Sequence, residues 1–294
     1  MCWVCRARPI STCLNCARQG EPATQGRPRS VPRILNLNKN GGRIEMRFQD
    51  KIAIVTGAGQ GIGEAYARAL ASEGAAVAVA EINEENGQRV AQEIVAAGGR
   101  AVFVKTDVSS PESAANLAAR VAAVFGGVDL LINNAAIFAG MRRESLLEVD
   151  YAYYQRFMEV NMNGALIVTR AVYRFMAARG GGAIVNQSST AAYEAGNYYK
   201  IAKTGLNAIT IGLARELGPL NIRINGVAPG PTDTTATRTS VPPERLQALL
   251  STLPLRRIGT TQDIVKTCLF LLSDDAGWVT GQTWCVDGGT VLKI

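Results

Sequence analysis

A tyrosine and a lysine four residues apart, Tyr199 and Lys203, are the side chains best suited to move a proton in this 294-residue chain. The chain contains no histidine, which excludes Ser-His-Asp triads, Cys-His pairs and His-ligated zinc. On a helix, this spacing places both side chains on one face, where an ammonium would lower the ordinary tyrosine pKa of about 10. The pair therefore predicts general acid/base chemistry, and the alternative is two solvated helix residues.

A glycine-rich segment, TGAGQGIG at residues 56–63, lies between a predicted strand at 51–56 and a predicted helix at 61–74. Glycines at such a junction permit a tight turn and let a pyrophosphate approach the N-terminus of the helix. The segment therefore predicts nucleotide binding.

Glu81 ends the second predicted strand, 24 residues after Gly57. A dinucleotide-binding fold places there the acid that binds the ribose hydroxyls, although a solvated glutamate at a strand end is the alternative. Residues 57–63 and 81–86 contain no Lys or Arg that would bind a 2′-phosphate. These features predict NAD rather than NADP as the cofactor.

Apolar runs of strand length alternate with helical periodicity along most of the chain. Runs that are apolar throughout predict strands buried on both faces, and the alternation predicts right-handed crossovers in a parallel sheet. The predicted fold class is therefore α/β, a Rossmann-like doubly wound parallel sheet, in a single domain at 46–294. The predicted strands are 51–56, 75–80, 101–106, 128–133, 182–188, 222–228 and 283–286, and the predicted helices are 61–74, 83–97, 111–125, 151–178, 197–217 and 262–272, with an irregular stretch at 231–260.

The first 45 residues differ in composition from the rest. They hold eight Lys/Arg, two acids and four of the six cysteines, namely Cys2, Cys5, Cys13 and Cys16. Because they lack a sustained apolar period, residues 1–45 are predicted to be a basic, disordered tail or a misplaced start before Met46. One alternative is a mitochondrial targeting peptide, although four prolines would interrupt its helix, and another is a zinc knuckle formed by the four cysteines.

Residues 46–294 carry almost no net charge, with 23 Lys/Arg and 22 acids in a chain whose total charge is +7. The body therefore shows no bias toward nucleic acid. No apolar run reaches the ~20 residues of a membrane-spanning helix. Two isolated cysteines, Cys268 and Cys285, fit a reducing, cytoplasmic compartment, and no plausible metal-ligand set is expected in the body.

A series of short motifs runs through residues 46–294 in a specific order. They are TGAGQGIG (56–63), Asp107-Val108, NNAA (133–136), VNMNG around Asn161, NQSS (186–189), YYKIAK (198–203), APGPTDT (228–234) and VDGG (286–289). With these motifs the chain resembles the short-chain dehydrogenase/reductase family over nearly all of 46–294.

The resemblance implies four catalytic residues. Tyr199 would be the general acid/base, and Lys203 would bind the nicotinamide ribose and lower the pKa of the tyrosine. Ser189 would hydrogen-bond the substrate oxygen, and Asn161 would hold a water in a proton relay to the lysine.

The resemblance also implies a set of NAD-binding residues, a small-molecule substrate and a homo-oligomer, either a dimer or a tetramer. Asp107 and Val108 would border the adenine, Asn133 and Ala135 would run beside the adenine ribose, and the loop after Pro229 would cover the nicotinamide carboxamide. The whole set is Gly57, Gln60, Gly61, Ile62, Gly63, Glu81, Asp107, Val108, Asn133, Ala135, Tyr199, Lys203, Pro229, Gly230, Thr232 and Thr234.

Two departures from the family pattern affect this site. Ala136 stands where the family usually has a glycine, which puts the local turn in doubt. Only nine residues separate Ser189 from Tyr199, fewer than is common, which leaves Ser188 as an alternative to Ser189.

The activity implied by the resemblance is NAD-dependent interconversion of a secondary alcohol and a ketone by hydride transfer. Residues 137–150 and 231–260 are expected to select the substrate. Leu246, Leu249 and Leu250 lie at helical spacing in the second segment, so they either cover an apolar substrate or pack on the domain itself.

Two alternative functions remain open at this point. Reduction of a 3-oxoacyl carrier-protein thioester is one, in which Arg256 and Arg257 would meet an acidic phosphopantetheine arm. A non-catalytic nucleotide sensor or scaffold on the same fold is the other, and the presence of both Tyr199 and Lys203 disfavours it.

Overall fold

Seven parallel strands form one sheet, in the order β3-β2-β1-β4-β5-β6-β7. The structure is a computed structural model that describes residues 46–292, so the predicted tail and its four cysteines lie outside the described residues. The order and the parallel pairing confirm the predicted Rossmann-like, doubly wound α/β domain. The strands are β1 Ile52–Thr56, β2 Ala76–Glu81, β3 Arg100–Lys105, β4 Leu130–Asn133, β5 Gly182–Gln187, β6 Ile222–Pro229 and β7 Thr283–Val286.

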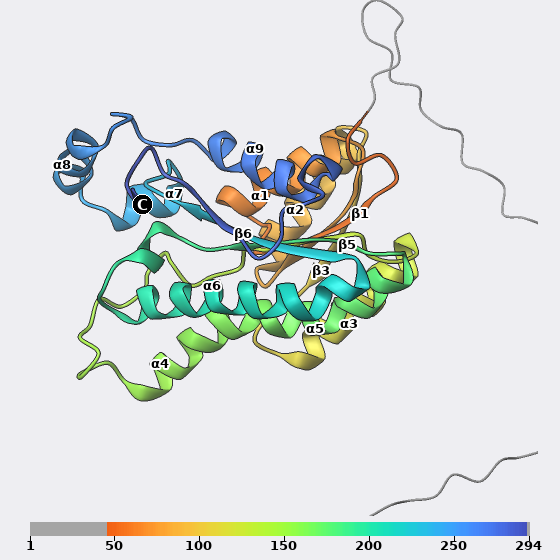
Figure 1. The fold of residues 1–294 in the computed structure, drawn as a ribbon, viewed down its shortest axis with the longest axis horizontal. Helices are drawn as coiled ribbons and strands as arrows, with labels where there is room; N and C mark the ends of the chain where they lie inside the picture. Colours follow the sequence, from red (N-terminus) through yellow and green to blue (C-terminus); the bar gives the residue numbers. More distant parts are fainter. Residues whose placement is uncertain (1–45, 293–294) are drawn as a thin grey trace, which may run out of the picture. The chain divides into compact units, whose positions relative to one another are not determined.

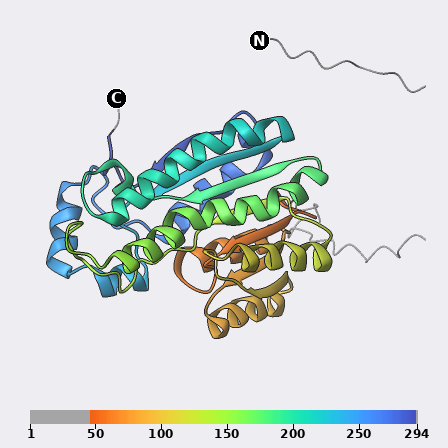
Figure 2. The ribbon, with the colours of Figure 1, turned by 90° about the horizontal axis from the view of Figure 1, so that it is seen from below.

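Helices cover both faces of the sheet (Figures 1 and 2). One face packs against α1 Gly61–Ser72, α2 Glu84–Ala96 and α9 Thr261–Leu272, and the other against α3 Pro111–Phe125, α5 Gly164–Ala178 and α6 Tyr198–Leu217. Alternate strand residues enter opposite cores, as Ala53 and Val55 do on one face and Ile52 and Ile54 on the other. This two-sided burial is the reason why the strands are apolar throughout.

The predicted helical stretch at 151–178 is helical throughout but contains a π turn that the sequence does not reveal. The chain forms α4 Tyr151–Met158, a π-helical turn η1 Glu159–Asn163, and then α5. A π turn adds a residue without ending the helix, so apolar spacing does not reveal it. The turn contains Asn161, and such turns occur frequently at functional sites.

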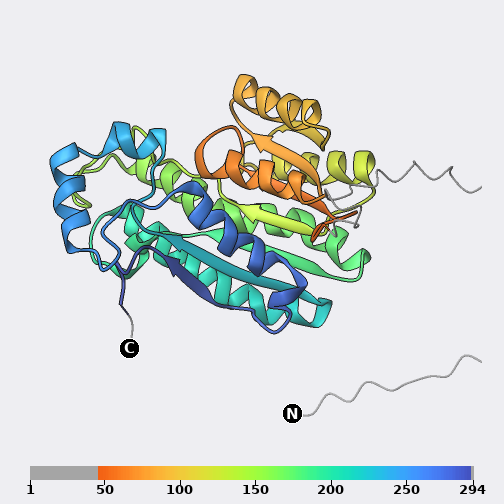
Figure 3. The same ribbon diagram turned by 90° about the horizontal axis from the view of Figure 1, so that it is seen from above.

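The stretch at 231–260, predicted to be irregular, contains two short helices, α7 Thr235–Ser240 and α8 Pro243–Thr252. Thr234 caps the first, because its hydroxyl accepts a hydrogen bond from the N–H of Thr237 at 3.1 Å. A proline at the first turn of α8 suits the start of the second. Figure 3 shows both helices beside the carboxyl end of the sheet. Shorter 3₁₀ turns lie at Thr190–Tyr193, Gly218–Leu220 and Asp274–Ala276.

The chain changes winding direction at β1, which pairs with β2 on one side and with β4 on the other. In open α/β sheets, ligands bind beyond the carboxyl ends of the strands at this switch point. The loops after β1 and β4 therefore meet where the predicted cofactor residues lie. Within residues 46–292, no helix is both long and apolar enough to cross a membrane.

Candidate active site

The glycine loop after β1 brings backbone segments so close together that two of its glycines leave no room for a Cβ atom. Gly57 has a φ of +62°, and a Cβ there would lie 2.7 Å from Cα of Ala135. A Cβ on Gly63 would lie 2.0 Å from the carbonyl oxygen of Gly57. Only glycine fits either position, and the result is a backbone-lined cradle at the N-terminus of α1 that suits a pyrophosphate.

Asn134 holds this cradle against the loop after β4, a role that sequence reasoning missed. Its side-chain amide donates to the carbonyl oxygens of Thr56 and Gly57, both at 3.0 Å. The Thr56 hydroxyl in turn accepts from the N–H groups of Asn134 at 3.0 Å and Ala135 at 3.1 Å. These bonds couple the two loops that line the switch point.

Ala136 fits the turn without strain. The non-glycine residues with positive φ in the described part of the chain are Asp50 and Asn221. Ala136 therefore does not have the positive φ that would favour glycine at this position.

Glu81 lies at the end of β2 with both carboxylate oxygens hydrogen-bonded. Oε2 accepts from the N–H of Gly59 at 2.9 Å, and Oε1 accepts from those of Ile82 at 2.9 Å and Asn83 at 3.0 Å. Three backbone donors fix the carboxylate on the pocket wall beside the glycine loop. A negative charge held there would bind ribose hydroxyls and repel a 2′-phosphate.

Two arginines lie close to predicted cofactor residues but outside 57–63 and 81–86, the segments in which the sequence shows no Lys or Arg. Arg89 donates to the carbonyl oxygen of Gly59 at 2.9 Å and pairs with Glu64 at 2.8 Å. Arg156 lines the pocket and pairs with Asp107 at 3.0 Å. Burial and hydrogen bonds act in opposite directions on Asp107, and the bonds from Ser109 and Arg156 prevail, so its pKa is lowered. Each arginine therefore already has a carboxylate partner.

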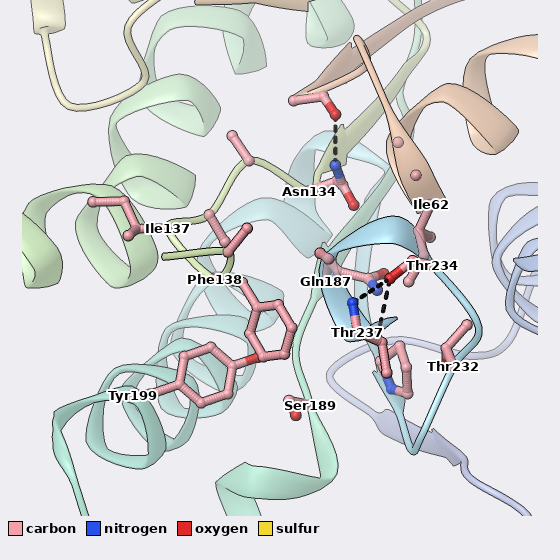
Figure 4. A pocket seen from close by; sticks show the side chains of 18 of the residues that line it. Ile62, Asn134, Ile137, Phe138, Gln187, Ser189, Tyr199, Thr232, Thr234 and Thr237 are labelled. Carbon is pink, nitrogen blue, oxygen red and sulfur yellow. Dashed lines mark hydrogen bonds between the residues drawn. The ribbon is translucent and has the colours of Figure 1, made fainter. Parts of the chain in front are cut away.

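Tyr199, Ser189 and Lys203 all line the pocket, and Figure 4 shows the first two of these side chains. Ser189 interacts with the hydroxyl of Tyr199, whereas the Ser188 hydroxyl donates to Asn207 Oδ1 at 2.6 Å. The geometry therefore favours Ser189 over Ser188. The ammonium nitrogen of Lys203 lies 5.9 Å from the centre of the Tyr199 ring.

The electrostatics of the pair differ from the sequence-based expectation. Burial raises the pKa of Tyr199 above its ordinary value, and the hydrogen bond with Ser189 opposes this shift. Lys203 is 2% exposed, and burial lowers its pKa to about 8. Its Nζ donates to the main-chain oxygen of Gln187 at 2.7 Å, so the ammonium faces a carbonyl dipole rather than the phenol.

Two predicted residues, Asn133 and Asn161, do not reach this pocket. Asn161 bonds the backbone of Ile137, accepting from its N–H at 2.6 Å and donating to its oxygen at 2.9 Å. Asn133 donates to Asn186 at 2.9 Å, while its own Oδ1 has no partner. Both border a separate cavity of about 10 Å³ behind Lys203, a volume close to that of one water.

The main pocket encloses about 760 Å³, within the range of small-molecule sites. All predicted site residues except Asn133 and Asn161 lie on its wall. Phe138, whose ring centre lies 5.6 Å from that of Tyr199, and Leu246 and Leu249 of α8 give the substrate side an apolar surface. Leu250 is not part of this wall.

The arginines considered for an acidic acyl carrier lie elsewhere. Arg257 forms two hydrogen bonds with Asp263, at 2.8 Å and 3.0 Å, and Arg256 does not line the pocket. No cluster of three or more metal-ligating side chains occurs among the described residues.

A family profile described as enoyl-(acyl carrier protein) reductase matches residues 57–291. Over 246 residues the chain is 56% identical to an uncharacterised oxidoreductase of Mycobacterium tuberculosis, covering 84% of this chain and 99% of that protein. The chain belongs to the short-chain dehydrogenase/reductase family.

Other members of the family carry more specific names. The chain is 36% identical over 245 residues to cis-4-hydroxycyclohexanecarboxylate dehydrogenase of Sinomonas cyclohexanicum, covering 82% of this chain and 97% of that protein. A solved structure of 7α-hydroxysteroid dehydrogenase with NADH and 7-oxo glycochenodeoxycholic acid has a TM-score of 0.80 at 35% identity, covering 85% and 97% of the two chains. The protein is an oxidoreductase of this family.

Proposed function

We propose that the protein is an NAD-dependent dehydrogenase that interconverts a secondary alcohol and a ketone on an apolar, cyclic frame. The observation that carries this proposal is the convergence of Ser189, Tyr199 and Lys203 on the wall of one pocket. The same wall continues to the glycine loop and Glu81, so proton-transfer groups and a dinucleotide cradle share one cavity.

Each side chain has a chemical role in this proposal. Tyr199 exchanges a proton with the substrate oxygen, and Ser189 hydrogen-bonds the same oxygen and orients it. The positive charge of Lys203 stabilises the phenolate form of Tyr199 and binds ribose hydroxyls. A bound nicotinamide supplies hydride donation or acceptance at its C4.

Glu81 supports a preference for NAD over NADP. Its carboxylate is held in place by three backbone N–H groups, so it cannot turn away from a 2′-phosphate without losing these bonds. The related 7α-hydroxysteroid dehydrogenase was solved with NADH.

The substrate class is supported by the pocket wall and by the relatives. Phe138, Leu246 and Leu249 add apolar side chains to the pocket that the catalytic groups line. Two relatives are named for a hydroxysteroid and a hydroxycyclohexanecarboxylate, and both compounds carry a hydroxyl group on a saturated ring.

Assembly and location belong to the same proposal. An edge strand, β7, and a fully exposed Trp278 offer an apolar surface that suits a homo-oligomer, a dimer or a tetramer. A cytoplasmic location is proposed because residues 46–294 carry only two cysteines, Cys268 and Cys285, as is typical of a reducing compartment.

The test is an NADH-absorbance assay with NAD and a panel of secondary alcohols, run with the full-length protein. The panel contains cyclohexanols, a hydroxysteroid and a linear secondary alcohol. In a separate reaction, a 3-oxoacyl thioester is supplied with NADH and the oxidation of NADH is followed. We expect turnover of the cyclic alcohols. Turnover of the thioester alone would overturn the substrate class, and NADH binding without any turnover would favour a sensor or scaffold.

A further inference from the structure

A buried tyrosine behind the pocket, Tyr66 on α1, holds a side chain of the pocket wall. The Tyr66 ring is fully buried, and its hydroxyl donates to Oε1 of Gln187 at 2.6 Å. Burial raises the pKa of Tyr66 well above its ordinary value, and an interaction with Cys268 of α9 adds to this shift. The phenol is therefore a permanent donor, and it fixes which end of the Gln187 amide faces inward.

Gln187 is the last residue of β5, is 7% exposed and lines the main pocket. Because Tyr66 occupies the side-chain oxygen, the N–H groups lie at the other end of the amide. The main-chain oxygen of Gln187 accepts the hydrogen bond from Lys203 at 2.7 Å. Gln187 therefore connects the catalytic lysine to a buried polar pair.

The position of Gln187 indicates which part of a dinucleotide it meets. Its side chain lines the same pocket as Thr232 and Thr234, the residues of the loop after Pro229 that the family resemblance assigns to the nicotinamide carboxamide. Lys203 lies behind it, and the phosphate cradle of the glycine loop belongs to the N-terminus of α1. A neutral amide donor between these groups suits a neutral oxygen acceptor.

We propose that Gln187 is a cofactor-positioning residue whose side-chain amide donates to the carboxamide oxygen of the nicotinamide, with Tyr66 holding the amide in that orientation. This inference rests on the proposed NAD-dependent function. Neither Tyr66 nor Gln187 belongs to the residues proposed above for ribose binding, phosphate binding or proton transfer.

The experiment asks whether Gln187 contacts the cofactor or whether the Tyr66–Gln187 hydrogen bond only stabilises the fold. It uses three full-length variants, Tyr66→Phe, Gln187→Leu and the double variant. Each single variant leaves one buried polar group without its partner, so both should lower Tm, and the double variant should recover most of that loss. NADH affinity, measured by fluorescence titration, should fall about three- to tenfold in Gln187→Leu and remain equally weak in the double variant. ADP-ribose, which lacks the nicotinamide, should bind all variants within about twofold of the wild type.

Several results would contradict the role of Gln187 or the proposed function. If NADH affinity recovers in the double variant together with Tm, the pair is structural and the inference is overturned. An equal loss of ADP-ribose affinity in Gln187→Leu would overturn the contact with the nicotinamide. If Gln187→Leu fails to fold, Gln187→Glu keeps an acceptor for Tyr66 and removes the donor, so it should still weaken NADH binding. A wild-type protein that does not bind NADH would instead refute the proposed function.

Discussion

At the residue scale, we propose that the phenol of Tyr199, which lines the pocket together with Ser189, is the proton-transfer group. We expect Tyr199→Phe to lower kcat by roughly 10²–10⁴ because general acid/base catalysis contributes about that much and the chain has no histidine to replace it. NADH affinity should stay within about twofold. Tyr198→Phe is the matched control, since the Tyr198 hydroxyl bonds the main-chain oxygen of Arg142. A Tyr199→Phe enzyme with more than a tenth of wild-type kcat would contradict the assignment.

Glu81 offers a second prediction at this scale. A carboxylate about 4 Å from a 2′-phosphate repels it by up to ~4 kcal/mol at an effective dielectric constant near 20, and ~1.4 kcal/mol is tenfold. We expect the wild type to favour NAD over NADP by at least about tenfold in kcat/KM. Glu81→Gln, which removes the charge and keeps an oxygen acceptor, should narrow this ratio. Glu84→Gln should leave it unchanged because Glu84 does not line the pocket, and an unchanged ratio in Glu81→Gln would rule out Glu81 as the discriminator.

Lys203 makes stability depend on pH in a defined direction. Burial lowers its pKa to about 8 in the folded protein, against about 10.4 in the unfolded chain. Between these values the unfolded chain binds more protons, so this group makes the free energy of unfolding rise as pH increases. Relative to Lys203→Met, the wild type should gain about 2 kcal/mol between pH 7.5 and 9.5, measured by urea denaturation. A difference that does not change with pH would show that the lysine titrates normally.

At the scale of elements, α8 is expected to act as an apolar cover for the substrate. Leu246 lines the pocket and Leu250, on the same helix, does not. Leu246→Ser should raise KM for a cyclic alcohol about fivefold because the loss of a partly buried leucine costs ~1 kcal/mol of apolar contact. The value of kcat should change less than twofold, and Leu250→Ser should leave KM unchanged. Equal effects of both substitutions would mean that α8 matters for folding rather than for substrate binding.

At the scale of the whole molecule, residues 46–294 are expected to fold and work without residues 1–45. The described residues 46–292 contain the complete seven-stranded sheet, both apolar cores and the pocket. The shortened chain should match the full chain in Tm within about 2 °C and in kcat/KM within about twofold. These limits correspond to no more than ~1 kcal/mol in the free energy of unfolding and ~0.4 kcal/mol in kcat/KM. Insolubility or the loss of most activity would show that the first 45 residues are part of the working structure.

The sequence by itself determined the elements and the order of the motifs. The apolar run at 51–56 predicts β1, and Ser110 followed by Pro111 predicts the start of α3, where the Ser110 hydroxyl accepts from the N–H of Ser113 at 3.2 Å. Strand burial and helix capping depend on neighbours within a few residues, so a local sequence pattern is enough to predict them. The Tyr-x-x-x-Lys pair can be predicted for the same reason, because Tyr199 and Lys203 lie about one turn apart on the same helix, α6.

Only the tertiary structure decided how these motifs meet. Asp107 and Arg156 are separated by 49 positions, and Tyr66 and Gln187 by 121, so no local pattern could join them. The sequence predicts that Lys203 lowers the pKa of Tyr199, but it does not reveal that burial acts on the same phenol in the opposite direction. The shift of a pKa depends on how much water is removed and on where the neighbouring dipoles point, and both are set by packing between distant segments.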